Sequence, residues 1–129
     1  MWGFCKPMTV RFVNPLPLVG NMAQAVSFYC AALGLKVAED HGDFVRFEGG
    51  FALHEGASLL RQALGVTPDG GPFGRDNLVL YFEADDLDEA FARVEGLAQI
   101  IHPVTLQAWG GRVFRCRDLD GHIIEIGEA

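Results

Sequence analysis

A carboxylate inside an apolar strand is the first candidate for chemistry in this sequence. Glu125 lies in the isoleucine-rich run His122–Glu128, which follows the tight acidic turn Asp118–Gly121. Aspartate and glycine in such a turn provide side-chain hydrogen bonds and a positive φ, so the chain can reverse into a strand. A charge in the middle of that strand either faces a polar cavity or lies on a solvated face.

Period-two alternation divides the side chains of each predicted strand between two faces. In the last strand, Ile124 and Ile126 share the side that would pack on helices, whereas Glu125 points to the other side. The same division over the other strands collects a mixed set of side chains on that second face: Asn14, Leu16, His54, Tyr81, Glu83 and Glu125. Such a mixed wall is typical of a small-molecule pocket.

The elements that must position these side chains follow a repeated order. Asn21 and Asp86 are good helix N-caps, Glu89 completes a capping box with Asp86, and Gly34 suits the end of the first helix. The predicted elements are strands over 9–19, 35–40, 43–48, 51–55, 78–84, 99–102, 112–117 and 122–128, and helices starting after Asn21 and Asp86. A short helix over 58–64 and a Gly/Pro loop over 67–75 interrupt this order.

The order is therefore βαβββ, long loop, βαβββ. Aligning the halves places Asn21 on Asp86 at the helix starts and Glu55 on Glu128 at the strand ends. A repeat of this size indicates duplication, so equivalent positions should have equivalent surroundings. We predict one α+β domain over 1–129, with a first module at 9–56, a connecting loop at 57–76 and a second module at 77–128, the modules forming a cupped mixed sheet. A long loop in a compact domain is usually a lid or an interface element.

Four stretches of this chain resemble the vicinal oxygen chelate superfamily: DLDGHIIEIGE, FYCAALGLKV, GFALHEG and WGGRVFRCRD. That superfamily includes glyoxalase I, bleomycin-resistance proteins, fosfomycin-resistance transferases and extradiol dioxygenases. The resemblance covers nearly the whole chain from Met8 onward, and the closing Asp-x-Asp-Gly-x-x-x-Glu is its most specific part. It implies paired βαβββ modules in a cupped sheet, a homodimer and, in many members, a divalent metal in the cup.

The resemblance places the ligands of the metal-dependent members at Asn14, Ala52, Val79 and Glu125. Only Glu125 is a usual ligand, because Ala52 and Val79 carry no donor atom and a neutral amide is a weak one. His54 shares a face with Ala52 and could replace it, so a Ni, Zn, Mn or Fe site would use His54 and Glu125.

Glu125 also has a reading without metal. Arg115 should point into the cup, by alternation and by the resemblance, and could pair with Glu125, since a buried carboxylate without a partner is costly. Trp109 precedes Gly110 in a loop, where it could cap the pocket as a flat wall for a planar ligand or pack on a partner subunit. The candidate ligand pocket is Asn14, Leu16, His54, Tyr81, Trp109, Arg115 and Glu125.

Composition excludes several classes of partner. The formal net charge of −7 comes without a basic patch, which argues against nucleic acid. No apolar run approaches the roughly 20 residues of a membrane span, and no signal peptide is evident. Cys5, Cys30 and Cys116 have no zinc spacing, so free thiols in a reducing cytoplasm are expected. The segment before Met8 precedes the first strand and is assigned no role.

These observations favour a small-molecule-binding protein of the glyoxalase/bleomycin-resistance type, with its ligand in the cup and the familiar metal site largely lost. No cofactor is firmly predicted. The alternative is a divalent-metal-dependent lyase or isomerase, in which Glu125 acts with His54. A dimeric scaffold without a ligand is the third reading.

Overall fold

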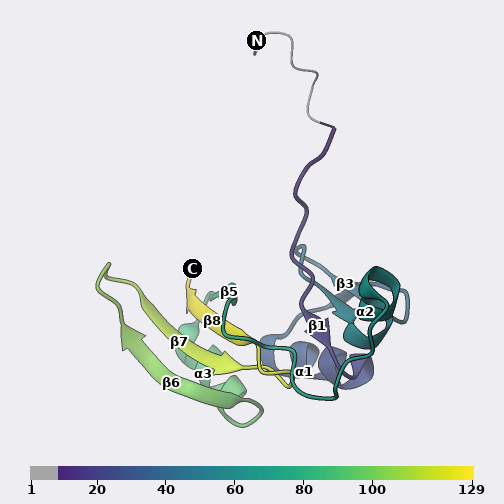
Figure 1. The fold of residues 1–129 in the computed structure, drawn as a ribbon. Coiled ribbons are helices and arrows are strands. Elements are labelled where there is room, and N and C mark those ends of the chain that lie inside the picture. Colours follow the sequence, from purple (N-terminus) through teal and green to yellow (C-terminus); the bar gives the residue numbers. More distant parts are fainter. Residues whose placement is uncertain (1–8) are drawn as a thin grey trace, which may run out of the picture.

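The structure is a computed structural model that describes residues 9–129, and the chain forms two βαβββ modules (Figure 1). The first module contains β1 (Leu18–Val19), α1 (Met22–Leu33), β2 (Val37–Asp40), β3 (Phe44–Phe47) and β4 (Ala52–Glu55). The second contains β5 (Val79–Ala84), α3 (Leu87–Glu95), β6 (Gln99–Leu106), β7 (Arg112–Arg117) and β8 (Ile123–Glu128). Helix α2 (Gly56–Leu64) follows the first module in the sequence and precedes the second. The α+β class and the two-module architecture are confirmed, while Cys5 and the extension before Met8 lie outside the described residues.

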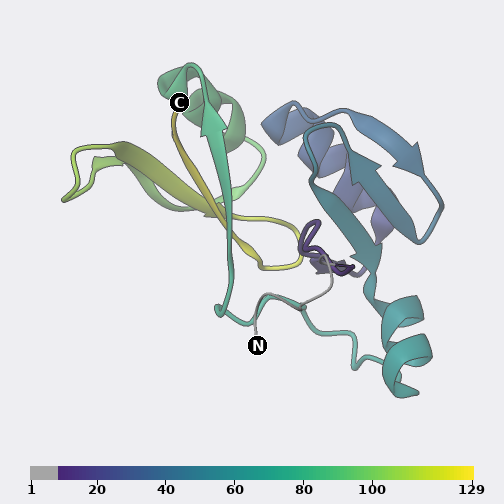
Figure 2. The same cartoon turned by 90° about the horizontal axis from the view of Figure 1, so that it is seen from above.

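The two sheets have equivalent topologies. Their strand orders are β1-β4-β3-β2 and β5-β8-β7-β6, and in each the first strand of the module pairs in parallel with the last. Helices α1 and α3 are in contact, and the modules lie side by side in Figure 2. One hydrophobic core joins both modules; it includes Val19, Phe28, Tyr29, Phe47, Leu53, Val94, Phe114 and Ile124. No helix among residues 9–129 is long and apolar enough to cross a membrane.

Local capping sets the helix boundaries as the sequence indicates. The Asn21 side chain accepts a hydrogen bond from the Gln24 N–H at 3.0 Å, and Asp86 accepts one from the Glu89 N–H at 3.1 Å. These bonds satisfy donors that the first turn of a helix leaves unpaired. Gly34 ends α1 with φ of 70°, a conformation that side chains disfavour.

The predicted strand over 9–19 is wrong for most of its length. Pairing with β4 includes only Leu18, opposite His54, and Val19, opposite Glu55. Pro17 faces β4, since its carbonyl accepts the His54 N–H, and Pro15 lies two residues earlier on the same side. Neither proline has an N–H to donate to β4, so the pairing ends here. Residues 9–17 instead form an extended segment, the N-terminal arm, that leaves the body of the molecule (Figure 1).

Strand β6 is longer than predicted, because it continues through Pro103 to Leu106 rather than ending at His102. Its register with β7 shifts twice, between Ile100 and His102 and again between His102 and Thr105. A proline is tolerated here because β6 is an edge strand and its outer side needs no ladder partner.

The loop that connects the modules is fixed to the β7–β8 turn. The Gly74 N–H donates to the Asp120 carbonyl at 3.0 Å, and Arg117 forms an ion pair with Asp76 at 2.7 Å. A side chain at Gly74 would collide with the backbone of Gly121, so the close approach requires glycine. These contacts hold the end of the loop against the second module.

One buried carboxylate joins the β7–β8 turn to the first module. Asp118 is 7% exposed, and its Oδ2 accepts a hydrogen bond from the Tyr29 hydroxyl at 2.6 Å. Its Oδ1 accepts the N–H groups of Asp120 and His122, both at 2.9 Å. Burial and the Asp118 charge raise the pKa of Tyr29 far above its usual value, so its hydroxyl stays a donor.

Two further bonds attach the same turn to the first module. The Asp120 side chain accepts the Gly20 N–H at 2.8 Å. Nε2 of His122 lies 2.8 Å from the Leu18 carbonyl, which can only accept, so this nitrogen carries the proton. The turn therefore positions both β1 and α1 relative to β7 and β8.

We expect Asp118→Ala to lower the free energy of unfolding by about 3 kcal/mol, because it leaves buried donors without an acceptor. Tyr29→Phe removes one of these bonds and should cost about 1–2 kcal/mol. Urea denaturation measures both values. Glu95→Ala, an exposed carboxylate, is the control and should change stability by less than about 0.5 kcal/mol. Equal effects of Asp118→Ala and Glu95→Ala would contradict the role of the buried carboxylate.

Candidate functional site

The second sheet aligns four polar side chains across its strands. Tyr81 of β5 is the register partner of Glu125 of β8, Glu125 is that of Arg115 of β7, and Arg115 is that of His102 of β6. We call Tyr81, Glu125, Arg115 and His102 the transverse row. Because neighbouring residues in register share a face of the sheet, the row lies on the side opposite the helices.

An ion pair forms the centre of the row. Arg115 donates from Nε to Oε1 of Glu125 at 2.8 Å, and the two side chains are 29% and 17% exposed. The partner expected for Glu125 is thus present. Partial burial reduces solvent screening, so this pair contributes more than a surface pair would.

His102 extends the row to the edge of the sheet. Its Nε2 lies 2.9 Å from Nη1 of Arg115, and its Nδ1 lies 2.7 Å from the Pro103 carbonyl. A guanidinium can only donate and a carbonyl can only accept, so the geometry requires a neutral imidazole with its proton on Nδ1. The sequence does not predict His102 in the row, because a proline at position 103 normally ends a strand. Continued alternation beyond Pro103 was the available signal.

Tyr81 lies at the other end of the row. Its hydroxyl donates to Glu83 at 2.8 Å, and this hydrogen bond raises the pKa of the phenol. A Cβ at Gly127 would lie 2.8 Å from the Tyr81 hydroxyl oxygen, so the ring lies against the sheet only because that residue is glycine. Tyr81 is 54% exposed and Val79, two residues earlier on the same face, is 47% exposed. They leave an apolar surface open beside the ion pair.

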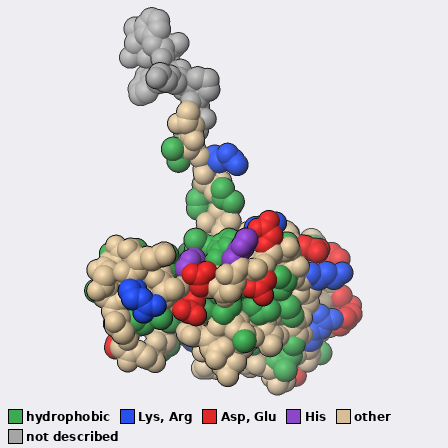
Figure 3. All heavy atoms as spheres, turned by 90° about the vertical axis from the view of Figure 1, so that its right-hand side faces the viewer, with side chains coloured by type: hydrophobic (Ala, Val, Ile, Leu, Met, Phe, Trp, Pro, Cys, Tyr) green, Lys and Arg blue, Asp and Glu red, His purple; other side chains and the backbone are tan. Residues whose placement is uncertain are grey.

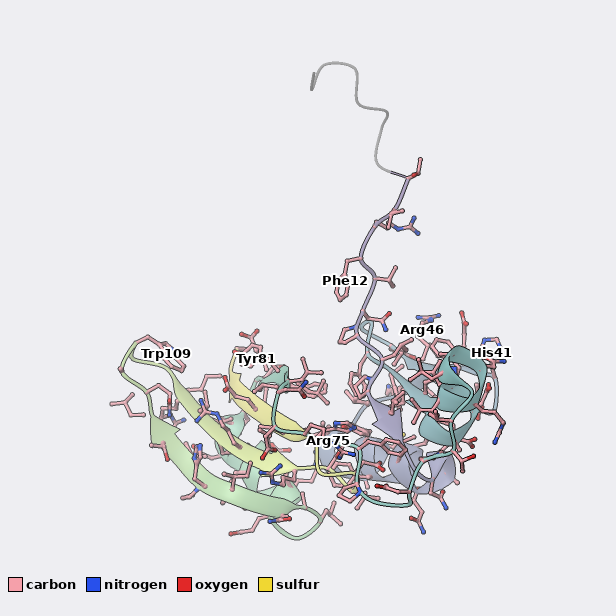
Figure 4. All side chains as sticks on the ribbon, viewed as in Figure 1. Phe12, His41, Arg46, Arg75, Tyr81 and Trp109 are labelled. Atoms are coloured by element: carbon pink, nitrogen blue, oxygen red, sulfur yellow. The ribbon has the colours of Figure 1, made fainter. Side chains whose placement is uncertain are left out.

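Trp109 stands in the hairpin between β6 and β7. Its side chain is 68% exposed, and its indole nitrogen packs over Gly111. Figure 4 shows Trp109 and Tyr81 on the same side of the second module. The indole therefore offers a flat apolar surface on the side of the sheet that carries the row.

Of the candidate pocket residues in the first module, only some lie near the second sheet. Leu16 borders a cavity of ≈180 Å³ together with Ile123 of β8, so it adjoins the second sheet. Asn14 lies on the N-terminal arm, where its amide donates to the Pro15 carbonyl. His54 makes its polar contact with the Glu55 carbonyl, and its ring lies near Phe44. The structure therefore brings Tyr81, Arg115 and Glu125 together, adds His102, and places Asn14 and His54 elsewhere.

The donor atoms do not fit a metal of the familiar geometry. The resemblance places metal ligands at four positions, and two of them, the fully buried Ala52 and the apolar Val79, have no side-chain donor atom. Glu125 is paired with a guanidinium, which competes directly with a cation for its oxygens. Among residues 9–129, no three His, Cys, Asp or Glu side chains gather in a group that could hold a metal.

Two βαβββ modules with a polar row on the open face of a sheet define a glyoxalase-type protein. The Glyoxalase-like domain family matches residues 12–129, and the chain belongs to that family within the vicinal oxygen chelate superfamily. None of the curated proteins matches the chain.

Solved structures share the fold of this chain. A protein of unknown function from Agrobacterium tumefaciens is 48% identical, with a TM-score of 0.89 and 98% of each chain covered. A glyoxalase/bleomycin resistance protein/dioxygenase from Nocardioides is 21% identical, with a TM-score of 0.71 over 95% of this chain and 85% of that one. A lactoylglutathione lyase from Agrobacterium tumefaciens is 24% identical, with a TM-score of 0.69 over 95% of this chain and 96% of that one. The last two show the shared fold alone.

We expect Arg115→Met to lower the free energy of unfolding by about 1–3 kcal/mol, because it leaves the half-buried Glu125 without its charged donor. Adding Glu125→Gln should recover part of the loss, since the remaining amide needs no cation. A double-mutant cycle measured by urea denaturation gives the coupling. Additive losses from the two substitutions would contradict a direct pair.

Proposed function

We propose that this protein binds a small molecule on the open face of its second sheet, over the transverse row. The observation that carries the proposal is the ion pair between Arg115 and Glu125, held in register between Tyr81 and His102. A structural ion pair alone would not require an aromatic ring and exposed apolar side chains beside it. A few fixed polar groups in an apolar surround are what an oriented ligand needs.

The chemistry of the row indicates the class of ligand. The Arg115 guanidinium has more N–H donors than its bonds to Glu125 and His102 use, so it can donate to an acceptor on a ligand. The Tyr81 hydroxyl gives its proton to Glu83 but keeps lone pairs. Val79, Tyr81 and Trp109 supply flat or apolar contacts. A planar molecule with a carbonyl or carboxylate acceptor matches these groups.

The lyase alternative has less support in the arrangement of donors. Glu125 is engaged by Arg115, and His54 makes its polar contact on the first module, so the pair that this alternative needs is divided. The similarity to a lactoylglutathione lyase is below the level at which activity follows from fold. The arrangement of Glu125 and His54 therefore favours ligand binding over a metal-dependent reaction.

A thermal-shift screen of aromatic carboxylates and aromatic ketones tests the proposal, because a ligand that binds only the folded state raises the melting temperature. We expect at least one compound to stabilise the protein, with its Kd raised at least about 10-fold by Arg115→Met or by Gly127→Ala. The glycine variant removes no functional group but displaces the Tyr81 ring.

Arg112→Met is the matched control. Arg112 lies on the same strand as Arg115 and is also ion-paired, but its partners are Glu128 and Asp88 of α3, on the helix side. This variant should keep the affinity within about 2-fold of the parent protein, since its side chain lies away from the row. Equal losses from Arg112→Met and Arg115→Met would place the ligand elsewhere, and a screen without any stabilising compound would favour the scaffold reading.

Metal analysis separates binding alone from a metal-dependent lyase. For protein purified without chelator, we expect fewer than about one bound Ni, Zn, Mn or Fe ion per ten chains, because the set of donor atoms is incomplete. Added divalent ions should leave the melting temperature unchanged. Stoichiometric metal that disappears in both Glu125→Ala and His54→Ala would overturn the binding-only proposal.

A further inference from the structure

The most exposed apolar side chains of the described chain gather on the N-terminal arm. Val10, Phe12 and Val13 are 76%, 82% and 71% exposed. Figure 3 shows the arm standing clear of the body with hydrophobic side chains and a basic one along it. Exposing such an apolar cluster to water is unfavourable in free energy, so burying it against another surface would stabilise the protein.

The arm has the composition of a strand but no strand partner. Residues 9–13 read Thr-Val-Arg-Phe-Val, which is rich in β-branched and aromatic residues. Their backbone makes no hydrogen bond with any other described residue. Fixing an extended segment costs conformational entropy, so a folded arm needs contacts that the described part of one chain does not supply.

The two prolines direct the arm away from its own sheet. Pro15 and Pro17 fix φ near −65°, and each restricts the preceding residue, Asn14 or Leu16, to an extended conformation. Folding back onto the same molecule would need a reversal in this stiffened stretch. Figure 4 shows Phe12 beyond these residues, on the part of the arm that stands clear of both modules, and its side chain is 82% exposed. The geometry therefore favours a second molecule as the acceptor.

A matching surface is present on the second module. Strand β5 is at the end of its sheet, so its outer edge has no strand partner among residues 9–129, and a cavity of ≈270 Å³ separates Val79–Phe82 from Pro15 and Gly49–Phe51 of the first module. Val79 and Tyr81 of that strand are about half exposed. The exposed Glu83 follows on the same face, and Arg11 is the one charged residue of the arm. The strand composition, apolar contacts and charge of the arm are complementary to this edge.

We propose that the chain dimerises by arm exchange, with residues 9–14 of each copy adding to the β5 edge of the other and Phe12 packing beside Val79 and Tyr81. A two-fold axis makes the exchange reciprocal, so each copy gives one arm and receives one, and the contact closes on itself at two chains. The dimer does not depend on the ligand proposal. An arm beside Tyr81 would also border the transverse row.

The oligomeric state tests the exchange. Light scattering across a dilution series should show a dimer, and Phe12→Asp should raise its dissociation constant at least about 100-fold. Phe12 is exposed in a single copy, so the change should not unfold the chain. Leu64→Asp is the control, because Leu64 is 68% exposed on α2, away from the arm and β5. A monomeric parent protein, or equal weakening by both variants, would overturn the proposal.

Photo-crosslinking locates the arm. We would replace Phe12 by p-benzoylphenylalanine, mix chains of natural and ¹⁵N isotope content, irradiate them and map the linked peptides by mass spectrometry. Mixed-isotope links to residues 79–83 are expected. Links within one chain would show that the arm folds back on its own sheet. Links between chains at another surface, or no links from a dimer, would equally refute the β5 edge as the acceptor.

Discussion

The hydrogen bonding of one buried carboxylate holds the two modules in their relative positions. Asp118 receives the Tyr29 hydroxyl from α1 with one oxygen and two N–H groups of its own turn with the other. A buried charge is stable only when such donors surround it. The turn that results sets where β8 begins, and the adjoining bonds of Asp120 and His122 place β1 and α1 against it. These bonds therefore also set the orientation of the second sheet, and of its open face, relative to the first module.

Strand register then brings distant sequence positions together in the transverse row. Parallel pairing of β5 with β8 and antiparallel pairing through β7 to β6 bring Tyr81, Glu125, Arg115 and His102 into line. None of these residues is close to its neighbours in the row along the chain. Glycine at 127 is as important as the polar groups, because it lets an aromatic ring lie flat beside them. The proposed ligand would therefore be recognised by fixed hydrogen bonds and apolar contact.

The sequence predicts what is local and what repeats. Caps such as Asn21 and Asp86 act within one turn, and the duplication gives the two-module fold without long-range information. The Glu125–Arg115 pair also follows from alternation. The contact of Asp118 with Tyr29 spans 89 positions, and Asp-Leu-Asp-Gly looks only like a turn. His102 was missed because Pro103 normally ends a strand. The unpaired arm is not predicted either, because prolines are compatible with an edge strand. In the structure only Leu18 and Val19 pair with β4.

The central claim is that a ligand binds over Arg115, and the Nε–H resonances of the arginine side chains test it most directly. A two-dimensional ¹H–¹⁵N spectrum follows these signals while a stabilising aromatic carboxylate is titrated. We expect a saturable shift of the Arg115 signal with little change at Arg112, whose partners lie on the helix side. A shift at Arg112 with none at Arg115 would contradict it, because the ligand would then occupy the opposite side of the sheet.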